Sequence, residues 1–187
     1  MDNLENLNPQ QLDAVTTTSG PILIVAGAGS GKTKVLTCRI AYLLQQGVLP
    51  YRILAITFTN KAAAEMRNRV DAMAGPGAKD VWLFTFHAFC VRVLRREIDK
   101  LGYYNNNFAI YDQDDARNLI KQVLKEMNLD EKRFAPANIQ ARISEAKNRM
   151  LGPEEYENQS GDFFERQVAK IYFSYEEKLH RNNAVDF

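Results

Sequence analysis

A short apolar run that leads straight into a glycine-rich loop constrains this chain more than any other feature. Residues 22–33 read ILIVAGAGSGKT, so a segment typical of a buried strand is followed by Gly27, Gly29 and Gly31. Glycine has no Cβ, and a loop of this kind can turn several backbone N–H groups toward one point. The helix expected after the loop directs its positive N-terminal end to the same point. The segment therefore predicts a strand, a phosphate-binding loop and a helix in succession.

Two residues at the end of the loop narrow the ligand to a nucleotide. Lys32 places a positive charge where β- and γ-phosphates lie, and the Thr33 hydroxyl is suited to bind Mg²⁺. The general pattern G-x-x-x-x-G-K-[ST] has glycine where this chain has Ala26. The apolar run before the loop and the helical pattern after it supply the context that the pattern requires. We therefore favour nucleotide binding over a flexible loop with an incidental lysine.

The composition excludes several classes of protein. The 187 residues suit one domain or a domain with a small neighbour, and 24 basic against 23 acidic side chains mean that any nucleic-acid surface is local. The N-terminal residues do not read as a signal peptide, and no apolar run approaches the length of a membrane span. Cys38 and Cys90 lie in helical patterns without metal-ligand spacing, as expected of small apolar residues. We expect a cytoplasmic protein with no membrane segment.

Apolar runs alternate with helical patterns in residues 1–107, which predicts an α/β domain with a parallel sheet. Continuous apolar runs are typical of strands buried on both faces of such a sheet. The ligand of such a domain lies beyond the carboxyl ends of its strands. The expected strands are 22–26, 53–57 and 81–85, and the expected helices carry apolar stripes over 36–44, 62–73 and 86–98.

Residues 108–187 predict a small helical domain, because strand patterns largely disappear there. Residues 105–107 form an Asn-rich turn or linker, and 108–111 is at most a short extended piece. Asp112 is a plausible N-cap for the first helix. Three helices are expected from apolar stripes over 116–127, 139–150 and 164–179.

Polar and aromatic residues near the loop suggest further contacts. The amide of Gln11 has both donor and acceptor atoms, so it can pair with the N6 and N7 edge of adenine, or it can be an ordinary exposed helix glutamine. Phe58 follows an expected strand within the segment ITFTN, where its ring can stack on a base while Thr59 and Asn60 hold phosphates. The alternative is that Phe58 packs under the loop and Asn60 caps the next helix.

The segment Thr85-Phe86-His87 also follows an expected strand. His87 can contact phosphate or can be an interior histidine with satisfied hydrogen bonds, and spacing alone favours the interior role. Arg92, Arg95 and Arg96 come next, and they are more typical of a solvated helix face than of a site.

Four segments together resemble the N-terminal part of the PcrA/UvrD/Rep group of superfamily 1 DNA helicases, which move 3′ to 5′ on single strands. The segments are LNPQQLDAV, AGAGSGKT, ITFTNKAAAEM and TFHAFCVRVLR, in this order, and the resemblance runs along essentially the whole chain. That group carries alanine at the position of Ala26. The resemblance implies that residues 1–107 are the N-terminal part of a RecA-like ATP-binding domain, called 1A, and that residues 108–187 are a helical subdomain, called 1B, which helps hold duplex DNA.

The resemblance also implies roles for individual residues. Gln11 matches the glutamine that reads adenine, Lys34 matches a basic residue near the nucleotide, and Thr33 matches the Mg²⁺ ligand. Contacts to ATP are then expected from Gln11, Ala26, Gly27, Ala28, Gly29, Ser30, Gly31, Lys32, Thr33 and Lys34, with Lys32 and Thr33 also catalytic. Contacts to single-stranded DNA are expected from Phe58, Thr59, Asn60, Thr85, Phe86 and His87.

The C-terminal end of the chain lacks motifs that the family would carry next. No Asp-Glu pair follows an apolar strand, so the Walker B carboxylates are missing, as are the water-polarising glutamine and the second RecA-like domain with its arginine fingers. Loss of an arginine finger alone can cost about 10³–10⁵ in rate. We therefore expect an inactive N-terminal fragment of an ATP-dependent DNA helicase used in replication or repair. Its expected partners are single-stranded DNA, a duplex junction and the missing C-terminal part of the same protein.

Two alternatives stay open, and the fragment reading has a consequence for folding. In the first, the isolated chain is a non-catalytic module that binds nucleotide or DNA. In the second, the chain is not a helicase part but a P-loop kinase or an unrelated NTPase with a helical lid. If later strands belong beside residues 22–26, backbone groups there stay unpaired and the chain can self-associate.

Overall fold

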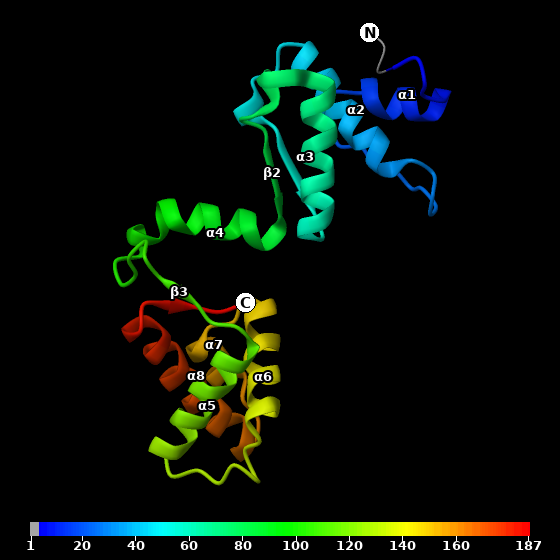
Figure 1. Cartoon of the computed structure of the whole chain (residues 1–187). Helices are drawn as coiled ribbons and strands as arrows, with labels where there is room; N and C mark the ends of the chain where they lie inside the picture. Colours follow the sequence, from blue (N-terminus) through cyan, green and yellow to red (C-terminus); the bar gives the residue numbers. More distant parts are fainter. Residues whose placement is uncertain (1–3) are drawn as a thin grey trace. The chain divides into compact units, whose positions relative to one another are not determined.

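The computed structural model describes residues 4–187, which form two compact units that divide between Arg92 and Val93. The described chain is α/β and mostly helical, with two small parallel sheets (Figure 1). The predicted boundary at residue 107 falls inside the second unit. No helix in the described part of the chain is both long enough and apolar enough to cross a membrane.

The first unit contains a two-stranded sheet with helices around it (Figure 1). Strands β1 and β2 pair in parallel, with Leu54 opposite Trp82 and Thr57 opposite Thr85. The helix between them, α3, packs on both strands, as a crossover connection requires. The elements are α1 (Pro9–Thr16), α2 (Lys32–Gln45), η1 (Pro50–Arg52), β1 (Leu54–Thr57), α3 (Asn60–Ala74), η2 (Gly75–Ala78), β2 (Trp82–Thr85) and α4 (Phe86–Glu97), which continues into the second unit.

The sequence predicted most of these elements correctly. The strands expected at 53–57 and 81–85 are present with bounds one residue shorter, and the three predicted helices are α2, α3 and α4. Burial on both faces was wrong for β1, where Leu54 and Ile56 stay 45% and 44% exposed. The core of this part gathers instead between α2, α3 and β2. It consists of Ile40, Ile53, Met66, Val70, Ala78, Val81 and Leu83.

The strand predicted at Ile22–Ala26 is absent. The segment has no regular secondary structure, and Leu23 and Val25 are 87% and 90% exposed. In the described part of the chain, both sheets have only two strands and neither includes these residues. A strand exists only through a partner that supplies its ladder of hydrogen bonds, and no such partner lies beside this apolar run.

The second unit is a helical bundle with one continuous core. Helices α5, α6 and α8 correspond to the three predicted helices, whereas the short α7 was not predicted. The second-unit elements are η3 (Ile98–Leu101), β3 (Ala109–Ile110), α5 (Gln113–Glu126), α6 (Pro136–Asn148), α7 (Pro153–Gln159), α8 (Phe163–Arg181) and β4 (Ala184–Val185). Its buried core includes Leu119, Ile120, Val123, Leu124, Phe134, Ile139, Ile143, Val168, Ile171, Tyr172, Tyr175 and Leu179.

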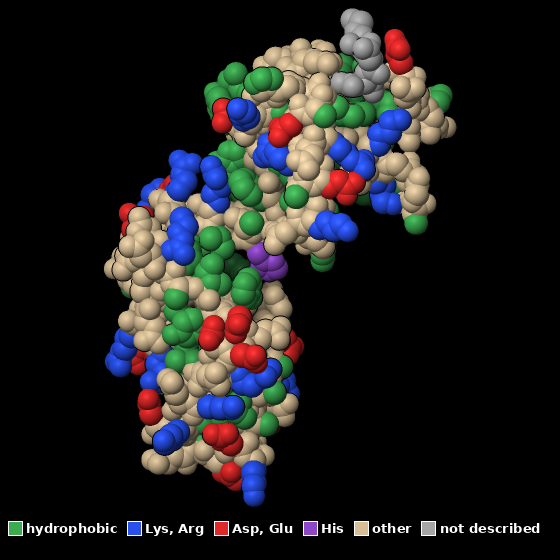
Figure 2. Space-filling view, in the orientation of Figure 1, with side chains coloured by type: hydrophobic (Ala, Val, Ile, Leu, Met, Phe, Trp, Pro, Cys, Tyr) green, Lys and Arg blue, Asp and Glu red, His purple; other side chains and the backbone are tan. Residues whose placement is uncertain are grey.

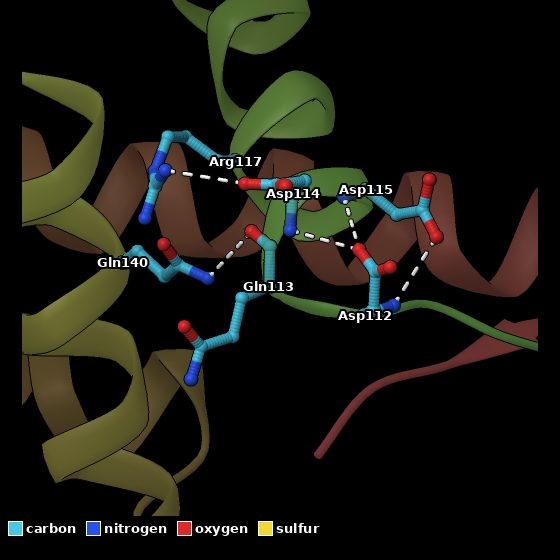
Figure 3. Close-up of polar contacts among 6 residues, drawn as sticks. All are labelled: Asp112, Gln113, Asp114, Asp115, Arg117 and Gln140. Atoms are coloured by element: carbon cyan, nitrogen blue, oxygen red, sulfur yellow. Dashed lines mark hydrogen bonds and ion pairs between the residues drawn. The ribbon is translucent and has the colours of Figure 1, made fainter.

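Asp112 caps α5, as predicted (Figure 3). Its carboxylate accepts hydrogen bonds from the N–H groups of Asp114 at 2.8 Å and Asp115 at 2.9 Å. In return, the Asp115 carboxylate accepts the Asp112 N–H at 3.2 Å, which completes a capping box. The amide of Gln140 on α6 donates to the Gln113 carbonyl at 3.0 Å, so the start of α5 is also tied to its neighbour.

A terminal clasp joins the two ends of the second unit. It consists of residues 105–111 and 183–186, in which β3 pairs in parallel with β4. Asn105 N–H donates to the Asn183 side chain at 2.9 Å, and the Asn183 amide donates back at 2.7 Å. Asn183 has a φ of 47°, a left-handed conformation that asparagine tolerates better than most residues. Sequence reading predicted only an extended piece at 108–111, because this pairing joins segments more than seventy positions apart.

Charged contacts hold the second strand of the clasp to the helices. Asp186 lies 2.6 Å from the Lys147 ammonium and accepts the Tyr175 hydroxyl at 2.7 Å. Lys147 also lies 2.7 Å from the Glu176 carboxylate. Burial of Tyr175 and the nearby Asp186 carboxylate raise the pKa of its hydroxyl, so Tyr175 acts as a donor.

Candidate nucleotide and nucleic-acid site

The glycine-rich loop, residues 26–33, turns sharply before α2. Gly29 and Gly31 have φ angles of 74° and 85°, values that non-glycine residues rarely adopt. Gly31 is also the N-cap of α2, and a Cβ there would lie 3.0 Å from the Gln11 amide nitrogen. The Ser30 hydroxyl donates to the Gly27 carbonyl at 2.7 Å and closes the turn. The loop therefore has the glycine turn and the following helix that the sequence predicted, although the preceding strand is absent.

Lys32 folds back over the start of this loop. Its ammonium donates to the Ala26 carbonyl at 3.0 Å and to the Gly27 carbonyl at 2.6 Å. Lys32 and Thr33 are both exposed, in the first turn of α2. The described residues contain no cluster of three His, Cys, Asp or Glu side chains that could hold a metal. A loop with these glycines, one exposed ammonium and one exposed hydroxyl at a helix N-terminus suits a Mg²⁺-bound polyphosphate.

Gln11 lies against the loop and is not a free surface glutamine. Its side-chain oxygen accepts the Asn8 N–H at 3.1 Å in a capping box at the start of α1, and its amide nitrogen donates to the Ser30 carbonyl at 3.0 Å. One N–H and one lone pair of the amide remain for a ligand. Lys34 also anchors this region, since its ammonium donates to the Asn6 carbonyl at 2.6 Å. Gln11, Lys34 and the loop thus meet in one place.

Phe58 projects from the loop between β1 and α3 with its side chain fully exposed. The loop is held beneath it, because the Thr57 hydroxyl donates to the Thr59 carbonyl at 3.2 Å. The Thr59 hydroxyl accepts the Ala62 N–H at 3.1 Å, so Thr59, and not Asn60, is the N-cap of α3. The alternative in which Phe58 packs under the loop is therefore wrong.

Thr85, Phe86 and His87 leave the sheet at the same edge as Phe58. Thr85 lies opposite Thr57 in the parallel register, so both loops begin at carboxyl ends of neighbouring strands. The Thr85 hydroxyl is buried and accepts the Ala88 N–H at 3.3 Å. Phe86 is 60% exposed and His87 is also exposed, so the interior role for His87 is wrong. Two exposed aromatic rings, Phe58 and Phe86, therefore begin at one edge of the sheet.

Lys and Arg side chains gather over α4 (Figure 2). Arg92, Arg95 and Arg96 are all exposed, in agreement with the solvated face that the sequence favoured. The Arg92 guanidinium lies 4.9 Å from the centroid of the Trp82 ring, a distance at which cation and ring attract. Arg92 therefore also covers an aromatic side chain of β2.

Both cysteines behave as small apolar residues. Cys38 is 1% exposed within the cluster that joins α1 and α2, and burial raises the pKa of its thiol despite the opposing effect of Lys34. Cys90 is half-buried.

Two structural contacts of the site were missed from the sequence. The capping box between Asn8 and Gln11 has a recognisable pattern, N-x-x-Q before an apolar helix, so it could have been found. The bond from Gln11 to Ser30 joins residues that are distant in sequence, and no local pattern announces it.

Comparison with known proteins shows the family to which this chain belongs. Residues 7–187 match the family described as UvrD/REP helicase N-terminal domain. The chain is 53% identical to the ATP-dependent DNA helicase PcrA of Bacillus subtilis (strain 168) over 185 residues, which are 98% of this chain and 25% of that protein. Over the same shares it is 51% and 49% identical to the PcrA proteins of Staphylococcus epidermidis (strain ATCC 12228 / FDA PCI 1200) and Staphylococcus aureus (strain NCTC 8325 / PS 47). The chain therefore belongs to the UvrD/REP helicase N-terminal domain family.

Proposed function

We propose that this chain is the ATP- and single-stranded-DNA-binding part of an ATP-dependent DNA helicase that moves 3′ to 5′. One observation carries the proposal: the first unit combines a glycine-rich loop contacted by Gln11 with two exposed rings at one edge of a parallel sheet. The named relatives, which are ATP-dependent DNA helicases, are about four times as long as the segment matched here.

The loop from Ala26 to Thr33 would hold the phosphates of ATP. Its backbone N–H groups and the N-terminus of α2 supply positive partial charges, and Lys32 adds a full charge once it leaves the two carbonyls. The Thr33 hydroxyl would hold Mg²⁺, which would supply neutralisation of the phosphate charge. Gln11 would pair with adenine, and Lys34 would lie near the nucleotide.

The sheet edge beyond β1 and β2 would hold the DNA strand. Phe58 and Phe86 are exposed rings on which bases can stack, and stacking is worth about 1–3 kcal/mol per base. Thr59, Asn60 and His87 would contact the backbone of the strand. Thr85, for which a contact with DNA was also predicted, is buried and would hold its loop in place instead.

We further propose a RecA-like arrangement for the whole protein. Residues 1–107 would be the first part of domain 1A, residues 108–187 subdomain 1B beside a duplex junction, and a second RecA-like domain would close on the nucleotide. Further strands would then cover the apolar run Ile22–Val25, whose side chains are exposed here.

For the 187-residue chain by itself we propose binding without turnover. In the described residues, the polar side-chain contacts of the loop are with backbone carbonyls and with Gln11. No carboxylate joins them, and phosphoryl transfer needs several charged groups placed together.

Titrations of the chain with a fluorescent ATP analogue and with labelled oligothymidylate test this function. Lys32→Ala is expected to weaken ATP binding strongly, whereas Phe58→Ala is expected to weaken only DNA binding, by about tenfold for one lost stacking contact. Equal loss of both ligands in Phe58→Ala would show that Phe58 is structural. DNA-dependent ATP hydrolysis by the purified chain would refute binding without turnover.

A further inference from the structure

Arg39 of α2 holds the C-terminal end of α1, the helix that carries Gln11. One nitrogen of its guanidinium donates to the Ala14 carbonyl at 2.7 Å and to the Thr17 carbonyl at 2.5 Å. The last carbonyls of a helix lack partners within it and carry negative partial charge, which a cation stabilises. Since α1 has no basic residue in its own last turn, Arg39 supplies the cation from the neighbouring helix.

The opposite end of α1 is fixed to the glycine-rich loop. Gln11 completes the capping box with Asn8 and donates to the Ser30 carbonyl. Between the two ends, Ala14 and Val15 pack against α2 in a small buried cluster. A helix of eight residues held at both ends has little freedom to tilt or slide. The contacts of Arg39 and of Gln11 therefore act on opposite ends of the same short helix.

We propose that Arg39 is a positioning residue for adenine recognition, which it serves by fixing α1 so that the Gln11 amide lies beside the phosphate-binding loop. The inference rests on the proposed function, in which Gln11 pairs with the N6 and N7 edge of adenine. Arg39 itself bonds to carbonyls at the C-terminal end of α1, and among the described residues it forms no hydrogen bond with the loop, so its effect passes through α1. An amide displaced from its place would lose discrimination between adenine and guanine, because that discrimination depends on paired hydrogen bonds.

A second arginine provides a matched control. Arg67 of α3 also donates to two backbone carbonyls, those of Ala78 at 3.0 Å and Val81 at 2.5 Å. Both arginines are half-buried in the same unit, and they differ in what they anchor. Arg67 holds the turn before β2 and has no contact with α1. Loss of Arg67 therefore reports the effect of removing a structural arginine without displacing Gln11.

The test measures dissociation constants of the 187-residue chain for ATP and GTP by displacement of a fluorescent nucleotide. The variants are Gln11→Ala, Arg39→Met, Arg39→Lys and Arg67→Met, each checked by circular dichroism and thermal melting. We expect Gln11→Ala to reduce the preference for ATP over GTP by about tenfold. Arg39→Met is expected to lose most of that preference, and Arg39→Lys, which keeps the charge and one donor, is expected to regain part of it. Arg67→Met is expected to have a lower melting temperature and an unchanged preference for ATP over GTP.

The outcomes separate this inference from the function on which it rests. If folded Arg39→Met keeps an unaltered preference for ATP over GTP, the positioning role is overturned, whatever Arg39→Lys shows. Equal loss of preference in Arg67→Met would overturn it too, because any destabilisation of the unit would then suffice. If the unaltered chain binds no ATP, or Gln11→Ala keeps the full preference, the proposed function fails instead. Should Arg39→Met not fold, Arg39→Lys is compared with Arg67→Met. A lower preference for ATP over GTP in Arg39→Lys than in Arg67→Met supports the positioning role, and an equal preference overturns it.

Discussion

The two units of this chain bury their apolar side chains in different ways. The second unit gathers them in one continuous core between α5, α6 and α8, and the terminal clasp joins the two ends of the chain that forms it. The first unit divides them between two smaller clusters and leaves Leu23 and Val25 almost fully exposed. The candidate site residues all lie in the first unit. A self-contained core thus characterises the helical unit, whereas the unit with the site exposes apolar surface that suits a partner.

The same substitution at two leucines gives the largest expected contrast. Leu124 in the core of the second unit is fully buried, and Leu124→Ala is expected to cost about 2–5 kcal/mol of unfolding free energy through lost burial and a cavity. Leu23→Ala removes a side chain that is 87% exposed and is expected to change stability by about 0.5 kcal/mol or less. Urea denaturation of both variants measures the two effects. Similar losses at the two positions would show that Leu23 is covered in solution, as self-association of the chain would cause.

The clasp gives the next largest effect. Asp186→Asn removes the charge that faces Lys147 but keeps an acceptor for Tyr175, and we expect a loss of about 1–3 kcal/mol because both charges are mostly buried. The control is Glu126→Gln, whose carboxylate pairs with Lys178 but is 59% exposed, so about 0–1 kcal/mol is expected. Hydrogen exchange at the Ala109 and Tyr111 amides, which donate across the clasp, should quicken only in the first variant. Unchanged exchange there would mean that Asp186 does not hold the clasp.

The helix caps give the smallest effect and compare the units directly. Asp112→Ala and Thr59→Ala each remove one side-chain cap and are expected to cost about 1 kcal/mol. Because Asp112 begins a helix of the continuous core, its loss should lower the melting of the second unit as a whole. Loss of the Thr59 cap should loosen the loop that presents Phe58. We therefore expect a clear loss of affinity for DNA and only a small decrease in melting temperature. Full affinity for DNA in Thr59→Ala would show that the cap of α3 is not needed for DNA binding.

Local and periodic features of the fold were predictable from the sequence. Apolar residues at helical spacing gave α2 to α6 and α8, because one buried face is enough to specify a helix. The Asp112 cap followed from its residue type before a helical stripe. The turn at Gly29 and Gly31 followed from the glycines, which alone adopt positive φ at no cost. The short α7 was missed because seven residues carry too little periodicity.

Pairing between distant segments was not predictable in the same way. The apolar run at 22–26 has the composition of a buried strand but no partner beside it, so composition alone misled. The strands β3 and β4 are two residues long, and they pair only because the bundle brings the ends of the unit together. The exposure of Phe58 and His87 was also undecided, since an aromatic after a strand can pack inward or outward.

By itself, the sequence determined the turn of the glycine-rich loop, most helices and the residue types that surround the loop. These features depend on backbone freedom, capping and spacing, which act between residues near one another in the chain. Only the tertiary structure decided that Gln11 contacts Ser30, that Arg39 anchors α1 and that Asn183 closes the second unit. Such contacts join residues that are far apart in the sequence. They form only when packing of the helices has already brought those residues together.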